Sequence, residues 1–225
     1  MKQNKEIKIS VSTNPPPVEE LLDYIKVLDK TNADYIHCDV MDGKFVVAKT
    51  FNHKEVEQIN NLTEKTLDVH LMVKHPYCKI KKYAKAGADI ITVHYESFKC
   101  KKKLIRCLKK IYGLGVKAGL SFSPKTDVSD ILPFVPYAQN ILVMSVVPGK
   151  SGQKFIEESY DKVKAVSLFL KENGLDDVTI EIDGGVNKDN MLKLSKLGVD
   201  IFVLGNYIYS SQDVKKTIDD LKGLK

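Results

Sequence analysis

A chain of 225 residues, of which 43% are hydrophobic, is long enough for one large core, and no stretch approaches the roughly 20 apolar residues that a membrane span needs. The polar opening MKQNKEIKIS lacks the apolar core of a signal peptide, so we expect a cytoplasmic protein without membrane association. The net charge of +6 favours an anionic partner, but Arg106 is the only arginine and the lysines are scattered, which argues against nucleic acid and for a small phosphorylated molecule.

Short runs rich in β-branched residues alternate with segments of helical periodicity along the whole chain. The predicted strands are Ile7–Ser12, Tyr35–Val40, Thr66–Met72, Ile90–His94, Lys117–Ser121, Asn140–Val146, Thr179–Asp183 and Ile201–Gly205. The predicted helices are Val18–Asp29, His53–Asn60, Pro76–Lys85, Lys101–Tyr112, Ser129–Pro133, Phe155–Glu172, Asp189–Lys196 and Asp213–Leu221. Glycines such as Gly87 and Gly198 supply helix stops.

Eight strands alternating with eight helices predict an α/β protein with a parallel sheet. Eight such units in this length predict closure into a (β/α)8 TIM barrel that forms a single domain over residues 1–225. An open doubly wound sheet is the alternative, but nothing like GxGxxG follows the first strand, so its nucleotide-binding version is disfavoured. In a barrel, catalytic side chains lie at the carboxyl ends of the strands.

Four cysteines show no CxxC spacing and are expected to be reduced thiols: Cys38, Cys78, Cys100 and Cys107. Neither a disulfide framework nor a cysteine-bound zinc is predicted.

Histidines and aspartates cluster at three strand ends. The second strand ends in IHCDVMDG and the third in LDVHLMV, and because alternate residues share a face, His37 and Asp39 point the same way. His70 occupies the matching place on the third strand, and Asp183 ends the seventh. A histidine at a strand end is often only structural, but the repeated His-x-Met pattern favours a joint site. Two imidazoles and two carboxylates predict a divalent transition-metal site.

Other titratable residues receive a different interpretation. Asp68 and Glu181 share the faces of the proposed ligands one layer deeper, where a buried carboxylate needs a partner, and we expect Lys8 to provide one. The remaining histidines are not expected to be ligands: His53, His75 and His94.

Glycine-rich segments follow the last three strands, as PGKSG at residues 148–152, DGG at 183–185 and Gly205-Asn206. Barrels often hold a phosphate between loops seven and eight, where glycine lets the backbone approach the anion. Each segment alone is compatible with an ordinary turn, and together they predict a phosphate site. The first is not a P-loop, because Met144 stands where that motif needs glycine.

These segments resemble the ribulose-phosphate 3-epimerase family along essentially the whole chain. The resemblance is carried by IHCDVMDGKFV, LDVHLMV, VMSVVPGKSGQKFIEES, IEIDGGVNKDN and VLGNYIY. It implies a TIM barrel of the ribulose-phosphate-binding type with one divalent metal ion, zinc foremost and iron, manganese or cobalt as alternatives. It also implies an isomerase of the pentose phosphate pathway that interconverts D-ribulose 5-phosphate and D-xylulose 5-phosphate through an enediolate, and a homo-oligomer, dimeric or hexameric.

The resemblance also implies residue roles. His37, Asp39, His70 and Asp183 match the family's metal ligands, with Asp39 as proton acceptor and Asp183 as proton donor. The substrate-binding residues that it implies are Ser12, Met41, His70, Met72, Met144, Gly149, Lys150, Ser151, Gly152, Gly184, Gly185, Gly205 and Asn206.

Three segments depart from the family pattern. The chain has VSTNPPP where the family reads close to PSILSAD, FVVA where it has FVPN, and PGKSGQ where it has PGFGGQ. None removes a ligand or proton carrier, but they bear on substrate fit, so a 3-epimerase for a six-carbon ketose such as allulose 6-phosphate is the first alternative. A sugar-phosphate decarboxylase is more remote, because His70 stands where such enzymes need lysine. A non-catalytic phosphosugar binder is disfavoured by the intact carboxylates.

Overall fold

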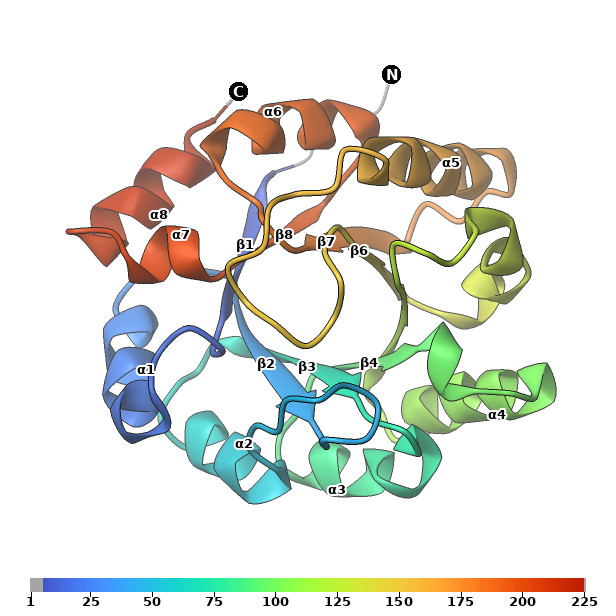
Figure 1. Cartoon of the computed structure of the whole chain (residues 1–225), viewed down its shortest axis with the longest axis horizontal. Helices are drawn as coiled ribbons and strands as arrows, with labels where there is room; N and C mark the ends of the chain where they lie inside the picture. Colours follow the sequence, from blue (N-terminus) through green and yellow to red (C-terminus); the bar gives the residue numbers. More distant parts are fainter. Residues whose placement is uncertain (1–5, 225) are drawn as a thin grey trace.

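The computed structural model describes residues 6–224 and contains a closed barrel of eight parallel strands, in the order β1 to β8 (Figure 1). The strands are β1 (Lys8–Ser12), β2 (Tyr35–Met41), β3 (Thr66–Met72), β4 (Ile90–His94), β5 (Lys117–Phe122), β6 (Asn140–Met144), β7 (Thr179–Asp183) and β8 (Ile201–Leu204). The predicted (β/α)8 barrel is therefore confirmed. Residues 1–5 of the polar opening segment lie outside the described part of the chain.

Helices surround the barrel on its outer side (Figure 1). They are α1 (Leu21–Asp29), α2 (His53–Asn60), α3 (Ile80–Lys85), α4 (Lys101–Tyr112), α5 (Ser159–Glu172), α6 (Lys188–Leu197), α7 (Asn206–Tyr209) and α8 (Val214–Lys222). In residues 6–224, none of these helices has the length and apolar character required to span a bilayer.

The strands are buried on both faces, as expected for a parallel sheet covered by helices. In β2 every residue is buried, and alternation sends Ile36, Cys38 and Val40 into the main hydrophobic core cluster. His37 and Asp39 lie on the opposite, inward face. The barrel interior therefore contains polar side chains, whereas the layer between strands and helices is apolar.

The connection after β5 differs from the prediction. No α-helix forms over Ser129–Pro133; two 3₁₀ segments, Val128–Asp130 and Leu132–Tyr137, take its place. Pro133 and Pro136 explain the difference, because each lacks the N–H group that an α-helix needs and short 3₁₀ turns tolerate this better.

Two further boundaries also differ. α5 begins at Ser159 instead of Phe155, because the preceding residues belong to a long loop, and α7 forms directly after β8 where no helix was predicted. The remaining ends of the strands and helices differ mostly by one or two residues, except that the predicted helices at Val18 and Pro76 each begin with a 3₁₀ turn.

The close approach of β4 and β5 generates a prediction. Thr92 pairs with Gly119 in register, and a Cβ added to Gly119 would lie 2.0 Å from Thr92 Oγ1 and 2.9 Å from Thr92 Cα. Since a side-chain rotation cannot relieve the second contact, we expect Gly119→Ala to lower the free energy of unfolding by about 1–3 kcal/mol. Urea denaturation measures this change.

The matched control is Gly223→Ala at the end of α8, where φ is −76° and the nearest atom to an added Cβ is 3.5 Å away. Equal stability of Gly119→Ala and wild-type protein would contradict the packing seen between β4 and β5.

Candidate active site

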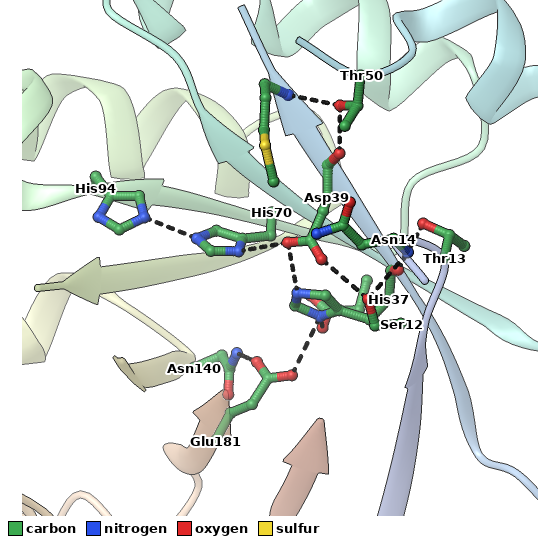
Figure 2. A network of polar contacts seen from close by, with 12 residues as sticks. Ser12, Thr13, Asn14, His37, Asp39, Thr50, His70, His94, Asn140 and Glu181 are labelled. Carbon is green, nitrogen blue, oxygen red and sulfur yellow. Dashed lines mark hydrogen bonds and ion pairs between the residues drawn. The ribbon is translucent and has the colours of Figure 1, made fainter. Parts of the chain in front are cut away.

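Four side chains converge at the carboxyl ends of β2, β3 and β7. His37, Asp39, His70 and Asp183 each offer a ligand atom, and these atoms all lie within 4.8 Å of one another. Asp39 and His70 are paired directly across β2 and β3, which brings their side chains to the same level of the barrel. Figure 2 shows Asp39 between the two imidazoles.

The oxygen Asp39 Oδ1 is the meeting point of this cluster. It lies 3.3 Å from His37 Nε2 and 3.1 Å from His70 Nδ1. These distances are close to the separation of about 3.3 Å expected between two atoms that both bind one tetrahedral zinc ion at 2.0–2.1 Å. His37 Nε2 is buried and has no hydrogen-bond partner among the described residues. These nitrogen and carboxylate donors therefore fit a divalent transition metal.

A carboxylate below the cluster orients His37. Its Nδ1 lies 2.5 Å from Asp68 Oδ2, and both side chains are almost completely buried. Burial opposes the charged imidazole, but the negative charges of Asp68 and Asp39 outweigh this effect and raise the pKa of His37 well above its usual range. An imidazole whose Nδ1 is held by a carboxylate directs Nε2 toward a metal, as in many metal sites.

The expected ion pair between Lys8 and these deep carboxylates is wrong. Lys8 is the first residue of β1 and is exposed, with its Nζ 6.0 Å from the centre of the Tyr35 ring. Asp68 instead contacts His37, and Glu181 accepts a hydrogen bond of 2.5 Å from Asn140 Nδ2. Burial raises the pKa of Glu181 well above its usual range, and the negative charge of Asp68 raises it further.

His94 lies inside the site, although it was not expected to be a ligand. Its ring is completely buried, and its Nε2 lies 2.8 Å from His70 Nε2, on the side away from Asp39 (Figure 2). Strand alternation could have predicted that His94 faces inward near His70. Thr92 pairs with His70, and His94 is two residues further along the same face of its strand. His53 packs edge-on against Tyr83, and His75 is exposed, so neither belongs to the cluster.

The two candidate proton carriers have opposite environments. Burial would raise the pKa of Asp39, but His37 and His70 outweigh it and hold that pKa well below its usual range. Ser12 Oγ also donates a hydrogen bond of 3.0 Å to Asp39 Oδ2. Burial raises the pKa of Asp183 to about 7, with a further contribution from the charge of Asp39. Such a split is typical of paired carboxyl groups with separate acid and base roles.

A cavity of about 350 Å³ opens above the cluster. Asp39 and Asp183 line it, together with all of the predicted substrate-binding residues except His70: Ser12, Met41, Met72, Met144, Gly149, Lys150, Ser151, Gly152, Gly184, Gly185, Gly205 and Asn206. The sequence interpretation missed five polar lining residues: Asn14, Gln153, Asn187, Tyr207 and Ser210.

Asn187 fastens the glycine segment after β7. Its side chain accepts hydrogen bonds from the backbone N–H groups of Asp189 and Asn190 and so caps α6. The Asn190 side chain accepts a hydrogen bond from Asn187 N through its oxygen and donates one to Gly185 O at 3.0 Å through its nitrogen. The sequence GGVNKDN thus forms a capping box that holds the turn at the cavity wall. Gly184 and Gly185 have φ values of 119° and 63°, which favour glycine.

A loop over residues 145–158 crosses the centre of the barrel and is drawn in gold in Figure 1. It touches both sides of the cavity mouth: a Cβ added to Gly149 would lie 2.6 Å from Val46 Cβ, and one added to Gly152 would lie 2.9 Å from Asn206 Nδ2. Gln153 Nε2 donates hydrogen bonds to Val147 O at 2.7 Å and Lys150 O at 2.8 Å. The loop is therefore braced internally and covers the cavity.

Removal of this brace should make the loop open more often. Because each hydrogen bond contributes about 0.5–1.5 kcal/mol, we expect Gln153→Ala to increase the rate of tryptic cleavage after Lys150 or Lys154 by roughly tenfold. Both lysines are exposed, and mass spectrometry of the fragments identifies the cleaved bonds. Gln58→Ala on the exposed face of α2 is the control. Cleavage of Gln153→Ala at the wild-type rate would refute the brace.

Comparisons with known proteins agree with this geometry. The Ribulose-phosphate 3 epimerase family model matches residues 8–209. Ribulose-phosphate 3-epimerase of Bacillus subtilis is 39% identical over 219 residues, covering 97% of this chain and all of that protein. Ribulose-phosphate 3-epimerase of Synechocystis is 38% identical over 222 residues, covering 99% of this chain and 96% of that protein.

Solved structures share the barrel at low identity. The 3-hexulose-6-phosphate synthase of Salmonella typhimurium aligns with a TM-score of 0.68 and 16% identity, covering 96% of this chain and 97% of that one. KGPDC of Streptococcus mutans aligns with a TM-score of 0.71 and 13% identity, covering 97% and 96%. These likenesses concern the fold alone, whereas the sequence matches identify the lineage: the chain belongs to the ribulose-phosphate 3-epimerase family.

Proposed function

We propose that this protein is a ribulose-phosphate 3-epimerase that interconverts D-ribulose 5-phosphate and D-xylulose 5-phosphate. The observation that carries the proposal is the placement of Asp39 and Asp183 on β2 and β7, both lining one cavity beside two imidazoles. Inversion at C3 removes a proton beside the carbonyl group and returns one to the opposite face. One group cannot readily reach both faces, so the reaction requires two proton carriers placed apart.

The environments of the two carboxyl groups suit these tasks. Asp39 is kept ionised by His37 and His70 and can accept the C3 proton, whereas Asp183, whose pKa is raised to about 7, can hold the proton to be donated. The roles exchange when the reaction runs backwards. Met41, Met72 and Met144 are almost completely buried at the base of the cavity. Their thioethers exclude water without offering a competing proton.

We infer that His37, Asp39, His70 and Asp183 hold one divalent cation, with zinc the first choice and iron, manganese or cobalt as alternatives. When bound, this ion stabilises the negative charge that develops on the substrate oxygens. The chain's own part is to hold the two imidazoles and the shared Asp39 oxygen in place. The Ser12 hydroxyl donates a hydrogen bond to the other oxygen of Asp39 and so fixes its position.

We place the substrate phosphate against Gly184, Gly185, Gly205 and Asn206. An added Cβ at Gly185 would lie 2.5 Å from Phe155 N, and one at Gly184 would lie 2.4 Å from Val146 Cγ2, so only glycine fits this wall. Loop 145–158 brings Lys150 and Ser151 to the same cavity. Lysine is a strong point-charge partner for phosphate. We expect the protein to act in the cytoplasm, because its polar opening segment lacks the apolar core of a signal peptide. As the family resemblance implies, we expect it to form a dimer or hexamer.

A 3-epimerase for a six-carbon ketose phosphate is the second candidate. Asn14 and Pro15, which belong to the altered VSTNPPP segment, line the cavity and could change the length of sugar that fits. A decarboxylase remains disfavoured, because His70 fills the place of the required lysine, with its Nδ1 3.1 Å from Asp39 Oδ1 and its Nε2 2.8 Å from His94 Nε2.

The two aspartates give the first functional test. Asp39→Asn and Asp183→Asn should each lower kcat for epimerisation by at least about a hundredfold, because each removes a proton carrier. Deuterium incorporation at C3 from heavy water measures the loss, and metal analysis of each variant reports whether the cation is retained. Asp220→Asn on the exposed face of α8 is the control. Substantial activity in either active-site variant would sink the assignment.

Substrate length requires a separate assay. We expect kcat/KM for D-ribulose 5-phosphate to exceed that for allulose 6-phosphate by about tenfold or more, because a cavity of about 350 Å³ covered by loop 145–158 discriminates against additional atoms. Both substrates are assayed side by side with the same enzyme preparation. Equal or higher kcat/KM with the six-carbon phosphate would favour the second candidate.

A further inference from the structure

A row of side chains extends from the proposed metal site toward the rim of the barrel. His70 Nε2 lies 2.8 Å from His94 Nε2, and His94 Nδ1 lies 3.1 Å from Glu96 Oε2. The two rings are completely buried and lie end to end, with centroids 4.9 Å apart and planes at 27° to each other. Figure 2 shows the first of these contacts, with His94 on the far side of His70 from Asp39.

The outer end of this row is firmly anchored. Glu96 Oε1 accepts a hydrogen bond of 2.7 Å from Ser123 N and another from the hydroxyl of Thr126. Burial would raise the pKa of Glu96, but the contacts with His94 and these donors lower it to about 2. The Phe45 ring packs against His94 at a centroid distance of 4.8 Å. Glu96 is therefore an ionised acceptor in a fixed position.

The direction of each hydrogen bond in the row follows from this anchor. An ionised carboxylate only accepts, so the hydrogen in the contact with Glu96 lies on His94 Nδ1. With that hydrogen on Nδ1, His94 can accept at Nε2 the hydrogen carried on His70 Nε2, 2.8 Å away. With its hydrogen on Nε2, His70 leaves Nδ1 free to bind a cation. This atom lies 3.1 Å from Asp39 Oδ1, another donor of the proposed site.

We propose that His94 and Glu96 are positioning residues that hold His70 in the tautomer and orientation needed to bind a divalent cation through Nδ1. The inference rests on the proposed ligand set and adds two residues outside it. His37 is oriented by a direct contact with the carboxylate of Asp68, whereas His70 is oriented by a carboxylate that acts through a second imidazole. Such supporting hydrogen bonds commonly change metal affinity by about 10–100-fold.

Glu96→Gln is the decisive variant, because it exchanges donor and acceptor in each hydrogen bond from residue 96 to His70. Ser123 N and Thr126 Oγ1 both donate to the Oε1 position, so the amide oxygen takes that place and the amide N–H₂ faces His94 Nδ1. His94 then accepts at Nδ1 and donates from Nε2, which places the hydrogen of His70 on Nδ1 and blocks the ligand atom. His94→Phe is the second variant, because it keeps an aromatic ring against Phe45 and removes both nitrogens.

The dissociation constants of Zn²⁺ and Co²⁺ are measured by competition with a chromophoric chelator, and the absorption spectrum of bound Co²⁺ reports its coordination. We expect Glu96→Gln and His94→Phe to weaken binding by about 10–100-fold and to alter the Co²⁺ spectrum. The melting temperature of the metal-free variants should stay close to that of the wild type. Glu96→Asp, which keeps an acceptor, should bind metal more like the wild type than Glu96→Gln does.

Matched controls are Glu57→Gln and His75→Gln, which change exposed residues of the same types. Unchanged metal affinity and Co²⁺ spectrum in Glu96→Gln would overturn the inference, as would equal losses in Glu96→Asp and Glu96→Gln. His70→Ala separates the two levels of the argument. If His70→Ala binds metal as tightly as the wild type, the proposed ligand set fails; if it loses affinity while Glu96→Gln does not, only the positioning role fails.

Discussion

The interior of a closed parallel barrel is shielded from water, so a polar side chain that points inward has to find its partner inside. In this protein the constraint is met by two branches that join at Asp39 Oδ1. One branch passes down through His37 to Asp68, and the other passes sideways through His70 and His94 toward the rim. Each imidazole therefore has one nitrogen engaged by the scaffold and the other directed at the same carboxylate oxygen. Contacts with the chain's own residues thus fix the orientation of both imidazoles.

Much of this architecture was predictable from local periodicity. The alternation of apolar runs and amphipathic segments was sufficient for the barrel, and the two-residue repeat placed His37 with Asp39 and His70 on the inward face. The glycine segments after β6, β7 and β8 also line the cavity as expected. The connection after β5 was harder, because an apolar run broken by Pro133 and Pro136 carries no clear period.

Partner choice inside the barrel was the part that periodicity could not supply. A strand shows which side chains face inward, but the partner of Asp68 depends on how neighbouring strands are staggered, and the partner is the imidazole of His37 and not Lys8. The strand that contains His94 offers no second ligand, so its sequence alone predicts no role for this residue, whose contact is with a histidine 24 residues away. Such cross-strand contacts become visible only when the barrel closes.

The register of β2 against β3 sets a limit on how this chain can diverge. Asp39 stands opposite His70 and Met41 opposite Met72, and a slip of one residue would turn each of these side chains toward the helices. A one-residue insertion or deletion in either strand would thus turn the polar side chains toward the helices and the apolar side chains into the barrel. Loops tolerate rewriting far better, and the three segments where the chain departs from the family pattern are substitutions around the mouth of the barrel. All three segments lie outside β2 and β3, so they leave the pairing of these two strands unchanged.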